Sequence, residues 1–485
     1  MSGPPEISSR RERVAGRPHV VVVGAGLAGL AAALACADGG AAVTVVERRR
    51  RLGGLTWSFE HDGRWIDNGQ HVFLRCCTAY RDFLARIGSA GDVEMQDRLD
   101  VTVLRPGRAG GPPDVARLRR NDLPAPLHMG AALLRYRHLG LADRLRLGLA
   151  ALPLRRVDLD DPALDAQTFG AWLSRHGQGP RAIGAMWDLI CVPTVNLPAA
   201  EASAAMGAKV FQTGLLTETS AADIGWSRIP LGRLHGERAA VALAHAGADV
   251  ALGERVVSIA ERKDPASPGV SEGKGPAAPL EVRTEGRTLD ADAVVLAVPH
   301  HAVNDVVARG TFAGQDELDG LGASPIVDVH VVYDRRVTDL TMAAGIDTPV
   351  GWLFDRTVSS GLADGHGQYL AVSMSAADAQ VGRRPEDLGP EVVAALADLL
   401  PAARDARVLD TLVTKEHKAT FRAVPGTAAL RPGPLTRTPG VVLAGAWTDT
   451  GWPATMEGAV RSGLAAARSA LVAAGSTRRL PEEVA

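Results

Sequence analysis

The chain has 485 residues, a length that suggests about two to three domains and a large core. Hydrophobic residues at 46% and charged residues at 22% are ordinary for a globular protein, and the formal net charge of -2 gives no support to nucleic-acid binding. The four cysteines show neither metal-ligand spacing nor a paired framework, which predicts no metal site and favours a reducing cytoplasm: Cys36, Cys76, Cys77 and Cys191.

The first segment, MSGPPEISSRRERVAGRP, is polar and basic and has no apolar h-region. It is therefore expected to form a disordered arm over residues 1–17 rather than a signal peptide. No uncharged apolar stretch of the sequence is long enough to span a bilayer. We expect a cytoplasmic protein, either soluble or peripheral on the inner face of the cell membrane.

A dinucleotide-binding βαβ unit is expected next in the chain. Residues 20–23 are typical of a buried parallel strand, residues 27–38 of a helix, and residues 43–47 of a second strand that ends on the acid Glu47. Strand, glycine-rich turn, helix, strand and acid follow one another in the order of this unit. The carboxylate of Glu47 is placed to accept a hydrogen bond from an adenosine ribose hydroxyl.

The glycines of the first turn have separate predicted roles. Gly24 allows a tight turn, Gly26 lets the backbone approach a pyrophosphate, and Gly29 lets helix and strand pack closely. The free N–H groups and the dipole at the start of the helix can then hold phosphates. The other predicted cofactor contacts of this turn are Ala25, Leu27 and Ala28.

A second glycine pair, Gly53-Gly54, follows the ribose acid closely, with Arg51 beside it. This arrangement lets backbone amides and a cation approach the pyrophosphate from a second side. The neighbouring predicted cofactor contacts are Arg48, Leu55 and Thr56.

The segment TWSFEHDGRWIDNGQHVF predicts a β-hairpin followed by a polar turn. Asp67 is expected to brace this turn rather than to react. Gly69 and Gln70 are predicted to contact the cofactor.

The sequence pattern changes several times between residues 121 and 299. Residues 121–225 are mainly helical, and residues 230–259 predict a helix and a strand that rejoins the α/β layer, with Val256 as a further cofactor contact. The Pro/Gly/Ser-rich stretch 261–280 is expected to be a flexible, solvated loop. The segment ADAVVLAVPH predicts a buried strand that ends at Pro299.

The last part alternates strands and helices from about residue 325 to 424. It ends in a strand, a loop rich in Gly, Trp, Thr and Asp, and a long helix that starts near Ala454 or Thr455. The start of a helix carries roughly half a positive charge, which could sit under the N1/O2 edge of a flavin, where reduction leaves negative charge. Gly445, Thr455 and Met456 are the predicted contacts. The N-terminal βαβ unit and the C-terminal helix start are far apart in the chain, and both are predicted to hold one extended cofactor. This arrangement favours a flavin dinucleotide over a nicotinamide dinucleotide.

We therefore expect two intertwined domains. The predicted nucleotide-binding domain comprises residues 18–100, 226–310 and 430–476, and the substrate domain residues 101–225 and 311–429. A tail follows at 477–485.

The sequence resembles a known superfamily at these motifs. Residues 20–29, Glu47, the segment RLGG and the C-terminal LAGAWTDTGWPATMEGAVRSG are similar to the FAD-dependent amine oxidases and phytoene desaturases. Within that superfamily, IDNGQHVF, MWDLICVPTVNLPAAEASA and SPIVDVHVVYD resemble the hydroxysqualene dehydroxylases. The resemblance implies an α/β fold, in which a Rossmann-like FAD-binding domain of the glutathione-reductase type is intertwined with an α+β substrate domain that carries a helical cap.

The resemblance also implies a reaction, the removal of the hydroxyl of hydroxysqualene with reduced FAD. The product is squalene, a precursor of hopanoids and related triterpenes. A lipophilic C30 isoprenoid is then the substrate, and contact with squalene-synthase-like enzymes of the same pathway is an expected partnership.

One position departs from the superfamily pattern. Its members usually carry an acid after the glycine that corresponds to Gly445, where it meets the ribityl or phosphate part of the flavin, and this chain has Ala446. Asp449 or a water could compensate.

The implied reaction needs a proton source, because hydroxide is a poor leaving group. His71 titrates near neutrality and could donate the proton, or it could only hold its turn or bond the polar edge of the flavin. Asp188 is the second candidate, since burial raises the pKa of a carboxyl; a helix cap or ion pair is its structural alternative.

Apolar side chains should form the walls of a dry site for the C30 chain. The predicted substrate contacts are Phe169, Trp187, Asn196 and Trp452, and further candidate walls are Trp172, Met186, Trp226 and Trp352. His300 and His301 follow a strand and are expected to form a surface turn.

Residues 127–152 carry four arginines among leucines: Arg135, Arg137, Arg144 and Arg146. Such a segment can lie on a membrane surface as the entrance for a lipid-soluble substrate, or it can be an ordinary solvated face.

Three other functions share the expected architecture. A carotenoid-type desaturase would oxidise a polyene with the same cofactor, and an amine oxidase is disfavoured because no aromatic pair is clearly placed to frame an amine. Rab escort and GDP-dissociation-inhibitor proteins bind prenylated partners without catalysis. The full set of predicted FAD contacts argues against such a carrier.

Overall fold

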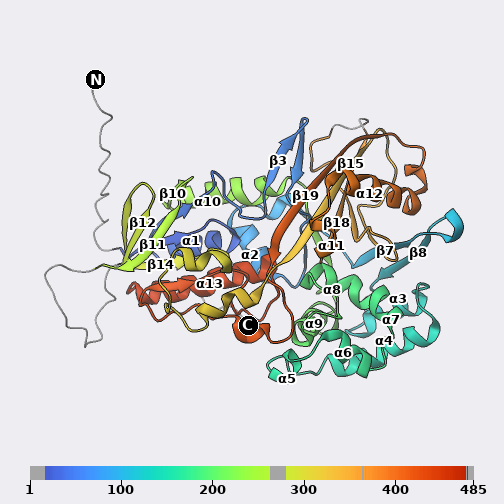
Figure 1. Ribbon diagram of the computed structural model, residues 1–485, viewed down its shortest axis with the longest axis horizontal. Helices are drawn as coiled ribbons and strands as arrows, with labels where there is room; N and C mark the ends of the chain where they lie inside the picture. Colours follow the sequence, from blue (N-terminus) through green and yellow to red (C-terminus); the bar gives the residue numbers. More distant parts are fainter. Residues whose placement is uncertain (1–16, 263–279, 363–364, 366, 477, 479–485) are drawn as a thin grey trace.

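The computed structural model describes residues 17–262, 280–362, 365, 367–476 and 478. The predicted basic arm, the insertion and the tail lie almost entirely outside these residues. The molecule is elongated, with the nucleotide-binding layer and the long mixed sheet at opposite ends of its long axis (Figure 1).

A five-stranded parallel sheet forms the first layer, in the order β10-β2-β1-β14-β20. Its strands are β1 (His19–Val23), β2 (Ala42–Glu47), β10 (Asp249–Leu252), β14 (Ala293–Leu296) and β20 (Val441–Leu443). Four of these strands, β1, β2, β14 and β20, are rich in valine and buried, as parallel strands covered on both faces require, whereas the edge strand β10 is largely exposed. β14 ends at Leu296, before the predicted Pro299, where its paired register with β1 and β20 also ends.

Two helices from opposite ends of the chain pack together beside this sheet. α1 (Leu27–Asp38) is apolar all round and runs along α13 (Met456–Ala473) (Figure 1). Their backbones come close at Gly463, where a Cβ atom would collide with the carbonyl oxygen of Ala28. The predicted first helix and C-terminal helix are confirmed.

The second large sheet has seven strands in the order β19-β15-β18-β17-β16-β7-β8. All neighbours are antiparallel except β16 and β7. The strands are β7 (Asp100–Arg105), β8 (Asp114–Arg119), β15 (Ser324–Tyr333), β16 (Met342–Gly345), β17 (Trp352–Asp355), β18 (Gln368–Met374) and β19 (Val408–Thr420).

One face of this sheet packs against α12 (Pro385–Leu399). This helix starts with proline and has Glu386 and Asp387 in its first turn, which suits the positive end of the helix dipole. Its buried side chains are Leu388, Val392, Leu396 and Leu399.

Smaller sheets accompany the two layers. They contain β3 (Ser58–His61) with β4 (Arg64–Asp67), β5 (Val72–Leu74) with β6 (Val93–Met95) and β9 (Ile224–Ser227), and β11 (Val256–Glu261) with β12 (Leu280–Thr284) and β13 (Thr288–Ala291). The hairpin predicted after Trp57 is β3–β4. The remaining helices outside the cap are α2 (Thr78–Arg86), α10 (Arg238–His245) and α11 (Asp378–Val381).

Helices cover the inner side of the mixed sheet as a cap (Figure 1). They are α3 (Gly130–Arg135), α4 (Leu141–Leu154), α5 (Pro162–Asp165), α6 (Phe169–Arg175), α7 (Pro180–Ala182), α8 (Asp188–Val195) and α9 (Ala204–Phe211). The sheets and the helical cap confirm the predicted fold class, a Rossmann-like layer combined with an α+β unit.

The domain boundaries stay our proposal. It is supported by the origin of the strands: the parallel sheet draws them from all three stretches assigned to the nucleotide-binding domain, and the seven-stranded sheet from both stretches of the substrate domain, with β7 beginning at Asp100.

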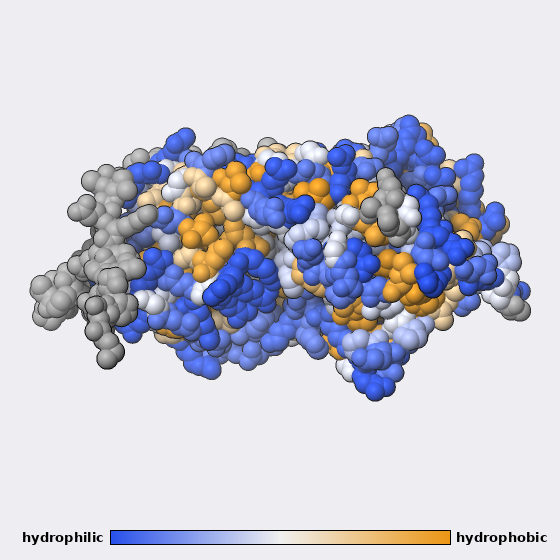
Figure 2. All heavy atoms as spheres, turned by 90° about the horizontal axis from the view of Figure 1, so that it is seen from above, coloured by the Kyte–Doolittle hydropathy of each residue, from blue (hydrophilic) through white to orange (hydrophobic). Residues whose placement is uncertain are grey.

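Hydrophilic side chains cover most of the face shown in Figure 2, and apolar side chains reach that surface in separate patches. Across the described part of the chain, no helix has the length and the hydropathy that crossing a membrane would require.

Candidate active site

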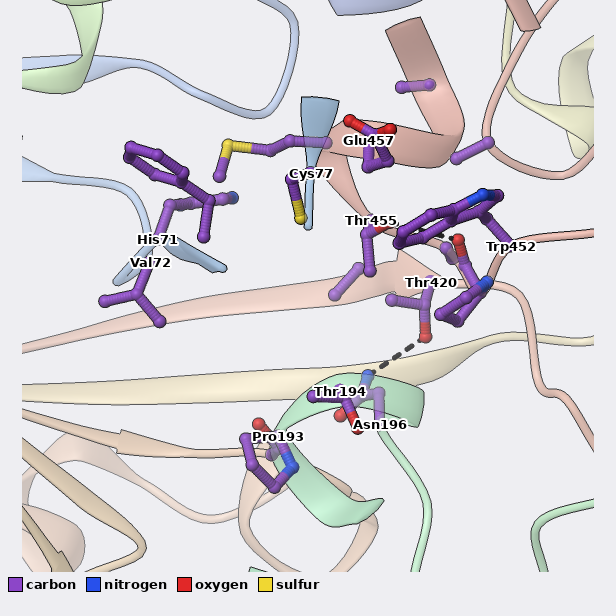
Figure 3. A pocket seen from close by; sticks show the side chains of 18 of the residues that line it. His71, Val72, Cys77, Pro193, Thr194, Asn196, Thr420, Trp452, Thr455 and Glu457 are labelled. Carbon is purple, nitrogen blue, oxygen red and sulfur yellow. Dashed lines mark hydrogen bonds between the residues drawn. The ribbon is translucent and has the colours of Figure 1, made fainter. Parts of the chain in front are cut away.

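One large cavity of about 1050 Å³ runs from the first glycine turn to the helical cap. It is lined by residues of the parallel sheet, the hairpin turn, the cap and the start of α13. Figure 3 shows His71 and Val72 on one wall, Asn196 of the cap below, and Trp452 and Thr455 on the side of α13. A cavity that joins a nucleotide-binding turn to an apolar chamber can hold a long cofactor and a substrate end to end.

The first glycine turn is tightly built. Gly24 has a φ of +102°, and a Cβ atom there would lie 2.5 Å from the carbonyl oxygen of Ala297. A Cβ atom on Gly29 would collide with the carbonyl oxygen of Gly24, so this glycine permits the close packing of helix and strand. Gly26 caps α1 without any side-chain hydrogen bond, which leaves the first N–H groups of the helix free to bind phosphate.

The second glycine turn lies against the first. The N–H of Gly53 donates to the carbonyl oxygen of Ala25 over 2.9 Å, and a Cβ atom on Gly54 would lie 2.8 Å from the Cα atom of Gly26. Gly54 has a φ of +60°. Thr56 holds this turn through a hydrogen bond from its hydroxyl to the carbonyl oxygen of Gly53. The two turns form one cradle of backbone amides.

Arg51 lies elsewhere than predicted. Its guanidinium donates to the carbonyl oxygen of Gly54 over 2.8 Å and stacks over Trp57, and Arg51 is not among the residues that line the cavity. Burial lowers the pKa of Arg51 to about 10. Arg51 therefore braces the second turn, whereas the arginines that line the cavity are Arg48, as predicted, and Arg49 and Arg255, which were not.

Glu47 lies at the end of β2 and lines the cavity. Its carboxylate accepts a hydrogen bond from the N–H of Ala25 and another from the N–H of Arg49, each 2.8 Å long. These bonds hold the carboxylate beside the first turn, at the place predicted for ribose recognition. Ala25 and Gly29 shape this turn without lining the cavity.

The far end of the cradle comes from the C-terminal segment. Gly445, Ala446, Thr455 and Met456 line the cavity, and the hydroxyl of Thr455 accepts a hydrogen bond from the N–H of Gly458 at the start of α13. Asp449 does not fill the place of the missing acid. Its side chain is exposed and accepts a hydrogen bond from the N–H of Gly451, because the loop turns it away from the cavity.

The other predicted cofactor contacts meet at the same cavity. They are Gly24, Gly26, Leu27, Ala28, Gly53, Gly54, Leu55, Thr56, Gly69, Gln70 and Val256. Among them, Gln70 has a buried amide nitrogen with no hydrogen-bond partner in the described part of the chain. A buried donor of this kind needs an acceptor from a bound molecule.

Asp67 braces the hairpin turn, as expected. Its carboxylate accepts hydrogen bonds from the hydroxyl of Ser58 and the N–H of Leu231, and it forms a 2.6 Å ion pair with Arg356. Both partners of the ion pair are buried. The turn that carries Gly69 and His71 is thereby tied to the substrate sheet.

His71 lines the cavity, and its Nδ1 lies 3.1 Å from the carbonyl oxygen of Gly69. Because a carbonyl oxygen only accepts, Nδ1 carries the ring proton. Burial lowers the pKa of His71, so the ring is neutral and Nε2 carries no proton. This geometry favours the predicted alternative in which His71 holds its turn over the one in which it donates a proton.

Asp188 lies outside the cavity lining. Its carboxylate accepts a 2.7 Å hydrogen bond from the N–H of Ala199, and burial raises its pKa. The prediction of a catalytic Asp188 is corrected here, because the side chain at the start of α8 faces the loop that follows this helix.

Asn196 lines the cavity, but both polar atoms of its amide already form hydrogen bonds with other residues of the chain. Its nitrogen donates to the hydroxyl of Thr420 (Figure 3) and to the carbonyl oxygen of Ser324. Its oxygen accepts from the N–H of Ala376. Its φ of +59° ends α8 in a left-handed turn. Asn196 therefore fastens the cap to β15 and β19.

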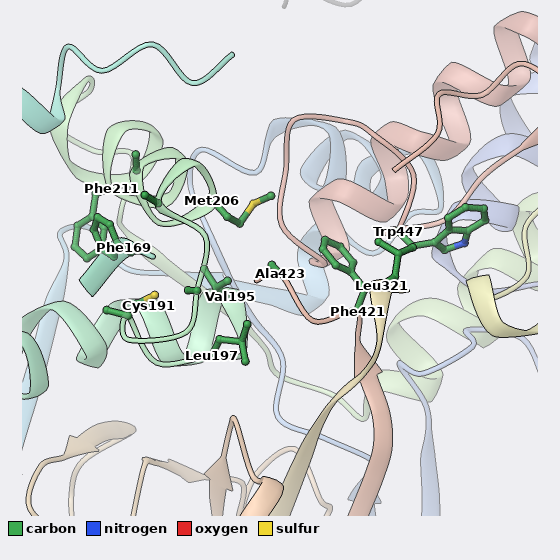
Figure 4. Close-up of a cluster of buried hydrophobic side chains, with 14 of the residues drawn as sticks. Phe169, Cys191, Val195, Leu197, Met206, Phe211, Leu321, Phe421, Ala423 and Trp447 are labelled. Carbon is green, nitrogen blue, oxygen red and sulfur yellow. The ribbon is translucent and has the colours of Figure 1, made fainter. Parts of the chain in front are cut away.

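The predicted apolar walls of the substrate site divide into two groups. Trp187, Met186, Trp352 and Trp452 line the cavity. Phe169 and Trp172 do not: Phe169 is fully buried between the helices beside Phe211 (Figure 4), and Trp172 stacks on His176. Trp226 is also absent from this lining. The prediction for Phe169 is corrected, because the cap uses its ring as core.

His300 and His301 both line the cavity; His300 is buried, which corrects the expectation of a surface turn at that residue, whereas His301 is exposed as expected. His300 is 9% exposed, and burial lowers its pKa to about 4. The turn after β14 is covered by β19, whose Glu416, His417 and Lys418 line the same region.

Asp328 was missed by the sequence reasoning. It lies on β15, lines the cavity and is 1% exposed. Burial raises its pKa to about 7. The available signal was a single acid inside the apolar run SPIVDVHVV, where a buried carboxylate has to be explained.

A flavin dinucleotide fits these features. The two glycine turns form a backbone cradle that a Cβ atom would fill, α1 presents uncapped N–H groups, and the amide of Gln70 lacks a partner among the described residues. The start of α13 lies at the other end of the same cavity. These are the donors that a pyrophosphate and a polar ring edge require.

Comparison with known proteins agrees with this site. The sequence profile of the flavin-containing amine oxidoreductases matches residues 27–471. The chain is 28% identical to hydroxysqualene dehydroxylase of Rhodopseudomonas palustris over 94% of this chain and 98% of that protein. It is 25% identical to 15-cis-phytoene desaturase of Synechococcus elongatus over 92% of this chain and 94% of that protein.

The fold is shared with solved structures. Cyclohexylamine oxidase of Brevibacterium oxydans superposes with a TM-score of 0.68 at 20% identity, over 96% of this chain and 100% of that one. The chain therefore belongs to the family of flavin-containing amine oxidoreductases and is an oxidoreductase with FAD as its cofactor.

Proposed function

We propose that the enzyme removes the hydroxyl of hydroxysqualene to form squalene, a precursor of hopanoids and related triterpenes. The observation that carries the proposal is the similarity to hydroxysqualene dehydroxylase along nearly the whole of both chains. A second relative of the same name, from Sinorhizobium fredii, is 27% identical over 93% of this chain. The long cavity with its apolar walls supports a C30 isoprenoid as the substrate.

The proposed reaction breaks an allylic C–O bond and forms a C–H bond. When bound and reduced, FAD supplies the hydride. The residues of this chain have three tasks: to hold the isoprenoid, to keep water away from the carbon centre, and to give a proton to the departing hydroxyl. Met186, Trp187 and Trp352 are placed for the first two tasks.

A carotenoid-type desaturase is the second candidate, because desaturases match the chain with similar identity and coverage. That reaction would use the same cavity and oxidised FAD to introduce double bonds. The two candidates differ in the direction of electron flow. A non-catalytic prenyl carrier would bind the isoprenoid without turnover.

Anaerobic incubation of the photoreduced enzyme with hydroxysqualene tests the proposal directly. We expect squalene in an amount that matches the reduced FAD, detected by mass spectrometry, with reoxidation of the flavin. A matched sample with the oxidised enzyme is the control and should form none. Desaturation of phytoene by the oxidised enzyme, with no squalene from the reduced one, would replace the proposal with the second candidate.

We also propose that the enzyme takes its substrate from a membrane surface through the cap. Exposed leucines gather on α4 and its surroundings: Leu127, Leu134, Leu141, Leu145, Leu149 and Leu152, each more than half exposed. Those of α4 recur at helical spacing and form one stripe. Exposed arginines flank them, at Arg135, Arg137 and Arg146. An apolar stripe between cations suits a bilayer with anionic headgroups.

This surface is continuous with the cavity. Leu127 and Leu152 are exposed and also line the cavity, and Leu147 and Ala151 of α4 form part of its wall. α4 lies at one end of the molecule (Figure 1). A lipid-soluble chain could therefore pass from a bilayer into the site along one helix.

Charges on the stripe should weaken membrane binding. For the variant Leu145→Glu/Leu149→Glu we expect at least roughly tenfold weaker binding to vesicles with phosphatidylglycerol, because burial of each leucine contributes roughly 1.5–3 kcal/mol. Flotation of the protein with the vesicles measures it. Leu435→Glu is the matched control, since Leu435 is 71% exposed beside the parallel sheet. Equal flotation of all three proteins would refute the surface.

A further inference from the structure

Asp328 is a buried carboxyl group at the wall of the cavity. It stands on β15, with Ser373 of β18 on one side and Thr414 of β19 on the other. The side chain of Ser373 and the backbone of Gln70 lower the pKa of its carboxyl and offset part of the effect of burial. Its Oδ1 is buried and has no hydrogen-bond partner in the described part of the chain.

Asp328 lies close to the turn that borders the site. A Cβ atom at Gly69 would lie 3.7 Å from Oδ2 of Asp328 and 3.5 Å from Cε1 of His71. The carboxyl and the imidazole therefore face the same point of the cavity wall. This is the turn whose residues Gly69 and Gln70 were predicted to contact the cofactor.

The groups around Asp328 favour its neutral form. Arg356 is paired with Asp67, and the charge of Asp67 itself opposes ionisation of Asp328. No ion pair reaches Asp328 in the described part of the chain. The pKa of its carboxyl is thus raised to about 7, mainly by burial.

The other titratable neighbours are neutral. His330 lies two residues further along β15 and hydrogen-bonds with Tyr369 and Thr414. Burial lowers the pKa of His330 to about 3 and raises that of the Tyr369 hydroxyl well above its usual range. The only ring proton of neutral His71 is directed to the carbonyl oxygen of Gly69. Asp328 is then the group at this wall that holds a transferable proton near neutral pH.

We propose that Asp328 is the catalytic acid that protonates the departing hydroxyl of the substrate. The inference rests on the proposed dehydroxylation. The carboxyl proton goes to the hydroxyl oxygen, the C–O bond breaks, and water leaves with the bonding electron pair. The carbon receives a hydride from reduced FAD, which is thereby oxidised by two electrons, and the Asp328 carboxylate regains a proton from solvent.

The pH dependence of the rate follows from this role. Asp328 is protonated below its pKa and ionised above it, so the rate of dehydroxylation should be constant below about pH 7 and fall about tenfold per pH unit above it. Asp328→Asn keeps the shape of the side chain and removes the proton. We expect kcat to fall roughly 10²- to 10⁴-fold, with KM little changed, and Asp328→Glu to restore part of the rate.

A second measurement needs no turnover. A trimethylammonium analogue, whose permanent cation replaces the carbinol carbon of hydroxysqualene, is titrated into the holoenzyme, and quenching of tryptophan fluorescence reports its binding. An ionised Asp328 attracts the cation, so binding should be at least about tenfold tighter at pH 8.5 than at pH 5.5. This dependence should vanish in Asp328→Asn.

Asp188→Asn is the matched control, because Asp188 is also a carboxyl with a pKa raised by burial, but it is only half-buried and lies outside the cavity lining. It should keep both the rate and the pH-dependent binding. Full activity of Asp328→Asn, or cation binding that does not depend on pH in the wild type, would overturn the assignment. A wild type that forms no squalene but still binds the cation with this pH dependence would refute the proposed function alone.

Discussion

Replacing Gly54 with alanine is expected to weaken FAD binding by roughly 10- to 100-fold. Gly54 has a φ of +60°, a conformation that costs other residues about 1–3 kcal/mol. The added Cβ atom would also lie 2.8 Å from the Cα atom of Gly26 and push the two glycine turns apart. The backbone amides would then no longer meet the pyrophosphate together. Titration of FAD into the apoprotein, followed by flavin fluorescence, measures the loss.

Gly63→Ala is the matched control for this effect. Gly63 has a φ of +72°, but no atom lies within 4 Å of its Cβ position, in the turn between β3 and β4. It should lose some stability and keep the FAD affinity of the wild type. Unchanged FAD binding by a folded Gly54→Ala protein would show that the two turns do not need to touch.

Replacing Arg356 with methionine should lower the free energy of unfolding by about 3–5 kcal/mol. Asp67 and Arg356 are 5% and 9% exposed, and their 2.6 Å ion pair joins the hairpin turn to the substrate sheet. Without the guanidinium, the carboxylate of Asp67 stays buried with no cation beside it, which is the costly state. Urea unfolding of the apoprotein, followed by circular dichroism, measures the change.

The double variant Asp67→Asn/Arg356→Met separates the buried charge from the lost packing. It removes both charges and retains an amide that can accept from Ser58 and Leu231, so it should recover much of the stability. If the double variant is no more stable than Arg356→Met, the unpaired carboxylate is not the cause of the loss.

The nucleotide-binding turn could be predicted from the sequence because its conformation depends on residues that are close together in the chain. A glycine with a φ of +102° at Gly24 and a close helix at Gly29 follow from the turn that joins one strand to one helix. Period and composition therefore predicted β1, α1 and β2 with nearly the observed limits. The start of α13 and the presence of the β3–β4 hairpin were predicted for the same reason.

The direction of side chains in loops could not be predicted from the sequence. Arg51 and Asp449 were assigned to the cofactor from their place in the chain, and both turn to bond nearby backbone groups instead. Phe169 and Trp187 lie in the same cap, but one became core and the other cavity wall. Which face of a short helix meets a cavity depends on the helices packed around it.

Local sequence thus sufficed for the glycine cradle, which is encoded within a few consecutive residues, whereas the fold class and the flavin dinucleotide were predicted from motifs at both ends of the chain. The identity of the acid required the assembled sheet. Asp328 alternates with apolar neighbours on β15, and only pairing with β18 and β19 puts it at the cavity wall and away from water. Burial is a property of the whole packing, and burial is what makes this carboxyl a proton donor near neutral pH.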